Sequence, residues 1–238
     1  MIKNKKAKFI ILSIVAIIII GIILTFFNNT TESSMEEEKN ATLSEEKKEE
    51  IINDLDRQIA KTNNDLVVEV NDEKITRKQL EFAKWQERNK IDKSNLDASD
   101  EAILNKLIKE CVMYQDAIKN NINLSKEEEN IINQNIDEVM NKNDTELTKI
   151  ANALELSNEQ FLNMYKEKIK RAEIISKWKI TLADKINTNE LKIEDNNFRE
   201  KYEKYNEEKD DKKRYTLLLE LINSYIENII KNATIIYH

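Results

Sequence analysis

The side chains that most often carry out chemistry are scarce in this chain. Its only histidine is His238, its only cysteine is Cys111, and the two lie far apart in the sequence. Zinc ligation needs clustered histidines and cysteines, and a serine nucleophile needs a nearby base and a G-x-S-x-G elbow. Acidic residues occur in runs at 36–38, 45–50 and 127–129, as is typical of solvated faces and helix starts. The sequence therefore predicts no catalytic residue, no metal site and no cofactor.

Large apolar side chains are the remaining candidates for a functional role. Most of them belong in a core, but methionine and aromatic side chains can also repack against many unfolded segments without requiring one sequence. Phe82 and Trp85 are the best candidates because they lie beside the core stripe of Leu80 and Ala83, not on it. A shallow polypeptide-binding groove is predicted from these residues: Phe82, Trp85, Met113, Tyr114, Met140, Phe161, Met164, Tyr165 and Trp178.

Composition indicates the fold class. Among 238 residues the only glycine is Gly21, and there is no proline. Sandwiches, barrels and Rossmann-like folds need glycine at turns and phosphate loops. A mainly α fold is therefore expected, with asparagine taking the place of glycine at helix C-termini. Cys111, alone on an apolar stripe, is expected to be a small buried hydrophobe and not a reactive thiol.

Charge excludes one class of partner. The net charge is −7, although residues 1–27 hold four lysines and no acid. The rest of the chain is therefore more acidic than the total suggests. Nucleic-acid binding needs a basic surface, so no nucleic-acid partner is expected.

The N-terminal region predicts a membrane anchor. Residues 9–27 carry no charge and are mostly Ile, Leu, Val or Phe. As a helix they would span about 28 Å, close to the hydrocarbon thickness of a bilayer. The basic flank, 1–8, predicts a cytoplasmic N-terminus and an extracytoplasmic C-terminal domain. A cleaved signal peptide is the alternative, with a weak cleavage site at 31–33.

Residues 28–63 are predicted to form a polar stalk followed by an amphipathic helix. The helix covers 44–62 and places Ile51, Ile52, Leu55 and Ile59 on one face. The pattern leaves open whether this face packs onto the following domain, at 64–238, or extends the stalk.

A β-hairpin opens that domain. Val67, Val68 and Val70 suit a strand, and Asn71-Asp72 suits a tight turn before a second short strand at Ile75. Because nearly all of the remaining chain has helical periodicity, the hairpin needs a distant partner strand. The best candidate is 233–237, ATIIY.

Helices are predicted for most of the remainder. Thr76 and Gln79, Ser125 and Glu128, and Ser157 and Gln160 each form a capping-box pair at a helix start. The expected helices cover 77–89, 99–120, 126–142, 145–155, 158–186 and 215–232. Residues 90–98 are expected to be a loop, and 207–214 a charged linker.

Two motifs resemble the extracytoplasmic foldases of the SurA/PrsA/trigger-factor-like type. Residues 68–76 read VEVNDEKIT, similar to the family's V-x-V-N-G-x-x-I-T opening, with Asp72 where the family usually has glycine. The second motif lies in the segment that links the end of one predicted helix to the acidic start of the next. Its residues are Gln115, Ala117, Ile122, Leu124 and Ser125.

The resemblance implies a SurA N-terminal-like helical domain over 64–238 whose first and last strands pair. A parvulin isomerase domain would be inserted near 207–214, but nothing of that size is present, and no residue inherits an isomerase role. The implied function is a membrane-anchored chaperone that transiently holds unfolded translocated polypeptides. An adaptor that binds one fixed envelope partner and a degenerate prolyl isomerase are the alternatives. A homodimer is left open.

Overall fold

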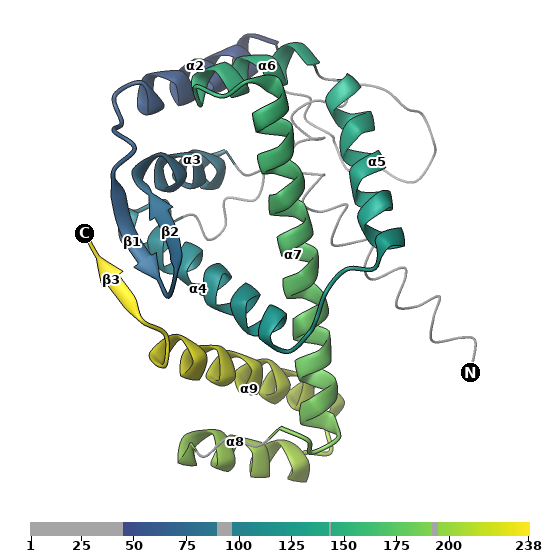
Figure 1. Cartoon of the computed structure of the whole chain (residues 1–238). Coiled ribbons are helices and arrows are strands. Elements are labelled where there is room, and N and C mark those ends of the chain that lie inside the picture. The colour runs from purple at the N-terminus through teal and green to yellow at the C-terminus, as the bar shows by residue number, and fades with distance from the viewer. Residues whose placement is uncertain (1–44, 90–96, 143, 192–194) are drawn as a thin grey trace. The chain divides into compact units, whose positions relative to one another are not determined.

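The computed structural model describes residues 45–89, 97–142, 144–191 and 195–238 (Figure 1). This part of the chain is mainly helical with a small three-stranded antiparallel sheet, as expected for the predicted mainly α class. In chain order the elements are α2 (Glu45–Ile59), β1 (Leu66–Val70), β2 (Glu73–Thr76), α3 (Arg77–Arg88), α4 (Asp100–Lys119), α5 (Lys126–Lys142), α6 (Asp144–Ala153), α7 (Asn158–Asn187), α8 (Asn196–Glu207), α9 (Asp211–Lys231) and β3 (Ile235–Tyr237).

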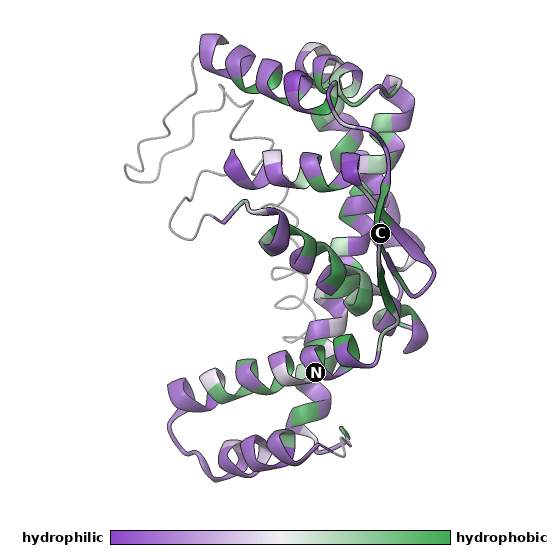
Figure 2. Ribbon diagram, turned by 90° about the vertical axis from the view of Figure 1, so that its left-hand side faces the viewer, coloured by the Kyte–Doolittle hydropathy of each residue, from purple (hydrophilic) through white to green (hydrophobic). Residues whose placement is uncertain are grey.

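The helices begin where the capping boxes predicted. Both hydrogen bonds of the box are present at the starts of α3, α5 and α7, each between an N-cap Ser or Thr and a Gln or Glu three residues on. Figure 2 shows hydrophilic and hydrophobic stripes alternating along the helices, as expected for amphipathic segments that bury one face.

Non-glycine residues end several helices in the left-handed conformation. Asn121 follows α4 with φ 57°, Glu155 follows α6 with φ 58°, and Asn189 follows α7 with φ 59°. Asparagine tolerates this conformation better than most residues do. The expectation that asparagine would replace glycine at C-termini is therefore confirmed at Asn121 and Asn189.

The described residues divide into two compact units. The first holds α2, α3, the first turn of α4, α5, α6 and the N-terminal half of α7. The second holds most of the three strands, the rest of α4, the C-terminal half of α7, α8 and α9.

In the first unit, α2 is part of the core. Leu55 and Ile59 are fully buried, and they pack in one cluster with Leu147, Ile150 and other residues of α6. The amphipathic helix predicted at 44–62 therefore packs on other helices, which answers the question that its pattern left open.

In the second unit, the N- and C-terminal strands meet as predicted. The strand order is β2-β1-β3, and β1 pairs with β3 in antiparallel register, with Val68 opposite Tyr237 and Val70 opposite Ile235. Asn71 lies in the turn with φ 54°. It accepts a 3.0 Å hydrogen bond from the Thr234 N–H through its side-chain oxygen, and its own N–H donates to the Thr234 carbonyl at 2.7 Å.

Helices α8 and α9 pack against each other in the second unit. Helix α9 begins earlier than expected, at Asp211, because Asp210 caps it by accepting from the Lys213 N–H. Helix α8 was not predicted; Asp195 caps it through the Phe198 N–H. Phe198 and Tyr205 anchor it by their burial.

No helix in the described part of the chain is long and apolar enough to cross a membrane. The predicted anchor at 9–27 and the polar part of the predicted stalk lie outside the described residues. Most of the loop predicted at 90–98 also lies outside them.

Candidate functional site

The nine predicted groove residues divide between the two units. The second unit holds Met113, Tyr114 and Trp178; the other six belong to the first. The buried members are Trp85, Met113, Phe161, Tyr165 and Trp178. The partly buried members are Phe82, Tyr114, Met140 and Met164.

Trp85 is part of the core, so the prediction that it lies off the core stripe is wrong. Its side chain is 8% exposed, and its indole N–H donates a 3.0 Å hydrogen bond to the backbone carbonyl of Ile51 in α2. Trp85 lies beside the apolar stripe that the sequence of α3 shows. Helix α2 covers that neighbouring face of α3 and thereby buries the Trp85 side chain.

Phe82 is half-buried beside Trp85. The two rings are nearly parallel, with centroids 5.8 Å apart, and the Lys168 ammonium lies 5.7 Å from the Phe82 ring centroid. A cation at this distance is attracted to the ring face. Phe82 therefore packs at the margin of the buried cluster that contains Trp85, with a lysine beside its ring.

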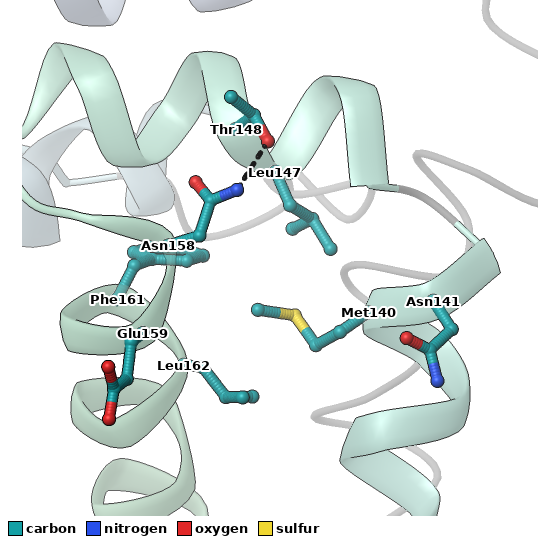
Figure 3. A pocket seen from close by; sticks show the side chains of 8 residues that line it. All are labelled: Met140, Asn141, Leu147, Thr148, Asn158, Glu159, Phe161 and Leu162. Atoms are coloured by element: carbon teal, nitrogen blue, oxygen red, sulfur yellow. Dashed lines mark hydrogen bonds between the residues drawn. The ribbon is translucent and has the colours of Figure 1, made fainter.

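An open apolar pocket lies instead between α5, α6 and α7 of the first unit. Met140, from the last turn of α5, extends toward Leu147 of α6 and Leu162 of α7 (Figure 3). Phe161 completes the apolar lining. Two of the predicted groove residues, Met140 and Phe161, therefore meet here.

Local sequence signals position the pocket residues. The Ser157–Gln160 capping box starts α7 at Asn158, three residues before Phe161, which fixes Phe161 and Leu162 in the first turns of that helix. Met140 contacts both neighbouring buried clusters: one contains Leu147 and Phe161, and the other contains Ile136 and Ile169. The pocket thus lies where the two clusters meet.

Polar side chains surround the apolar lining. Asn141, Thr148, Asn158 and Glu159 form the rim, and the Asn158 side-chain amide donates to the Thr148 hydroxyl at 2.8 Å (Figure 3). This bond links the start of α7 to α6 and leaves the apolar floor open. An apolar side chain could enter while the polar groups around it stay hydrated.

The pocket's volume limits what it can hold. It encloses about 200 Å³, whereas sites for drug-sized ligands typically span about 300–1,000 Å³. A cavity of about 150 Å³ accommodates benzene. The pocket therefore fits one large apolar side chain and is too small for a typical organic cofactor.

The sequence did not reveal the partners of Met140 and Phe161. Leu147, Leu162 and the rim residues were not among the predicted residues. The usable signal was the position of three predicted helix ends, near 142, 144 and 158. The sequence shows where these ends lie, but not that they converge.

No family model matches the chain, and no match was found among curated proteins. The resemblance to SurA/PrsA-like foldases therefore remains a hypothesis that depends on short motifs. The described residues also contain no group of three or more His, Cys, Asp or Glu placed to hold a metal ion.

Proposed function

We propose that this protein is a membrane-anchored, extracytoplasmic, chaperone-like protein that transiently holds unfolded polypeptides. The observation that supports it best is the open pocket lined by Met140, Leu147, Phe161 and Leu162. In this proposal the pocket receives one large apolar side chain of a client at a time.

The chemistry of the lining suits a client without a fixed sequence. Met140 has a flexible, polarisable side chain that fills irregular shapes. The three other lining residues are aliphatic or aromatic and make no demand for a hydrogen bond. Burying one Leu- or Phe-sized side chain is worth about 1.5–3 kcal/mol. Such a contact releases quickly, as transient holding requires.

The finer fold assignment also belongs to this proposal. A SurA N-terminal-like domain needs its first and last strands to pair, and the register of Val68 with Tyr237 is consistent with that requirement. The proposed anchor is the uncharged stretch at 9–27, with its basic flank in the cytoplasm. In this arrangement the pocket-bearing unit would meet polypeptides as they leave the membrane.

An aggregation assay tests the proposal. The full chain in lipid nanodiscs is mixed with two unrelated denatured enzymes, citrate synthase and reduced lysozyme, and light scattering is followed against empty nanodiscs. At near-stoichiometric amounts the chain should slow the aggregation of both. A chain that affects neither client, but captures one envelope protein, would support the adaptor alternative instead.

A matched pair of variants on α5 links the effect to the pocket. Met140→Gln replaces a pocket-lining thioether by an amide, whereas Ile131→Gln changes a side chain on the same helix that is 38% exposed and lies outside the pocket lining. Met140→Gln should lose most of the protection and Ile131→Gln should keep it, at a temperature where circular dichroism shows that both variants are folded. Equal protection of the clients by the two variants would show that the pocket does not bind them.

A further inference from the structure

The outer edge of β3 is open for pairing in the second unit. The strand order β2-β1-β3 places β3 at the edge of the sheet, with β1 on one side only. Backbone groups on the other side of an edge strand form a template for an additional strand.

The register shows which groups point outward. The His238 N–H donates to the Val67 carbonyl at 3.0 Å, and the Asn71 N–H donates to the Thr234 carbonyl at 2.7 Å. Hydrogen-bonded pairs alternate along an antiparallel ladder. The backbone groups of Ile235 and Tyr237 therefore point away from β1. Within the described part of the chain, the backbone N–H and carbonyl groups of Ile235 and Tyr237 make no hydrogen bond.

The apolar face of the sheet continues onto this edge. Directly opposite residues of paired strands share one face, so Tyr237 lies on the same face as Val68. Val68 is 0% exposed, whereas Tyr237 is 63% exposed. The face of the sheet that is buried at Val68 is therefore exposed to solvent where it continues onto β3, at Tyr237. A strand added beside β3 would place its own side chains next to Tyr237 and cover it.

We propose that the outer edge of β3 binds an extended segment of another polypeptide as a fourth strand, with apolar side chains at alternate positions. The proposal rests on the polypeptide-holding role above and names a second contact for that role, through the backbone of the client. The backbone hydrogen bonds do not depend on the client's sequence. The exposed Tyr237 side chain favours client segments that have apolar residues at alternate positions.

The partner is another polypeptide and not a second copy of this chain. Each copy carries a net charge of −7, so two copies repel when their edges approach. A client segment without net negative charge gains the same backbone bonds to β3 without this repulsion.

Hydrogen exchange of the full chain in nanodiscs tests the proposal directly. The probe is an acetylated, amidated peptide of about eight alternating Val and Thr residues, close to the usual length of a strand. Its control is the same peptide with every amide nitrogen methylated. The unmethylated peptide should slow exchange of the Ile235 and Tyr237 amides about tenfold, because the amides gain acceptors. The methylated peptide should not. Unchanged exchange with the unmethylated peptide would overturn the proposal.

A pair of substitutions at the first residue of β3 provides the second test. Ile235→Pro removes one outward N–H without removing a donor from the β1–β3 ladder, and proline is tolerated at this position of an edge strand. Ile235→Thr keeps both the N–H and the β-branched shape. The proline variant should bind a fluorescent form of the peptide about fivefold more weakly than the threonine variant. Equal affinities would count against edge pairing, and the exchange test on the unsubstituted chain decides if the proline variant does not fold.

Two further outcomes separate the hypotheses. If the Ile235 and Tyr237 amides are already protected without peptide and sedimentation shows a dimer, a second copy occupies the edge and the proposal is wrong. If the peptide leaves the edge unaffected while Met140→Gln still loses protection of clients, the edge proposal fails and the holding function stands. If the peptide binds the edge but neither client is protected, the holding function fails.

Discussion

Trp178 of α7 donates its indole N–H to Oδ2 of Asp116 in α4 at 2.8 Å. The same oxygen accepts from the Asn120 side-chain amide at 3.1 Å and from the Tyr225 hydroxyl at 3.3 Å. The Trp178 and Tyr225 rings also contact each other, with centroids 5.9 Å apart. One carboxylate therefore joins α4, α7 and α9 within the second unit.

Removal of this acceptor should destabilise the protein. Asp116→Val leaves the Trp178 N–H and the Tyr225 O–H without their partner, and hydrogen bonds to charged groups are worth about 1.5–3 kcal/mol each. We expect a loss of about 2–4 kcal/mol in the free energy of unfolding, measured by urea titration with far-UV circular dichroism. Asp116→Asn keeps an acceptor oxygen and should lose about 1 kcal/mol. Equal losses for the two variants would contradict a role as acceptor.

Tyr225 should make stability pH-dependent in alkaline solution. Burial and the neighbouring Asp116 carboxylate raise the pKa of Tyr225 to about 12, from an ordinary value of 10. Below pH 10 the phenol is protonated in both the folded and the unfolded chain. Between these two values the unfolded chain releases the proton while the folded chain keeps it, so stability falls as pH rises.

The Tyr225→Phe variant tests this. It has no proton to release at this position, so its free energy of unfolding should decline less steeply across the same pH interval than that of the unsubstituted chain. Tyrosinate absorbance should also show that the variant lacks a tyrosine that ionises near pH 12 in the unsubstituted chain. Parallel pH profiles for the two proteins would show that the raised pKa makes no contribution.

The helices and their starts could be predicted from the sequence because their signals are local. The pairs at 76/79, 125/128 and 157/160 satisfy backbone donors within one turn, and this geometry depends little on the rest of the fold. The pairing of β1 with β3 was predictable for a different reason. Few segments outside the hairpin have β-branched composition, so Ile235 and its neighbours were the only good partner.

Burial between helices could not be predicted in the same way. The pattern of α3 alone places Trp85 beside its apolar stripe, and only the contact with Ile51 in α2 puts it inside the core. The pocket is a similar case: Met140 and Phe161 are visible as large apolar residues, but their convergence with Leu147 depends on how three helix ends meet. Helix α8 was missed because most of its residues are charged or polar, so only a few side chains carry its apolar periodicity.

Trp85→Ala should cause a large loss of stability. The side chain is buried against α2, and removal of a buried Trp or Phe typically costs about 3–5 kcal/mol. Trp85→Phe keeps most of the ring and loses the hydrogen bond to the Ile51 carbonyl, so about 1–2 kcal/mol is expected. Urea unfolding of both variants measures the difference. A loss below about 1 kcal/mol for Trp85→Ala would show that α2 does not cover this side chain in solution.

Glu155→Gly should stabilise the protein although it removes an ion pair. Glu155 holds φ 58° after α6, and a left-handed conformation costs a residue with a Cβ about 1–2 kcal/mol. Glycine avoids this cost but gives back about 0.5–1 kcal/mol through the greater freedom of the unfolded chain. The Glu155 carboxylate is 65% exposed in its ion pair with Lys78, and exposed pairs are worth about 0–1 kcal/mol. A small net gain of about 0.5 kcal/mol is expected when the pair is at the weak end of that range.

Two controls separate the backbone term from the ion pair. Lys78→Ala removes the pair and leaves the left-handed residue in place, so its effect on urea unfolding measures the pair alone. Asn121 is also left-handed, and asparagine tolerates this conformation. Asn121→Gly should therefore change the free energy of unfolding by close to zero. If Glu155→Gly destabilises the protein by more than Lys78→Ala does, the left-handed conformation of Glu155 costs less than the roughly 0.5–1 kcal/mol that glycine gives back, and the predicted gain is wrong.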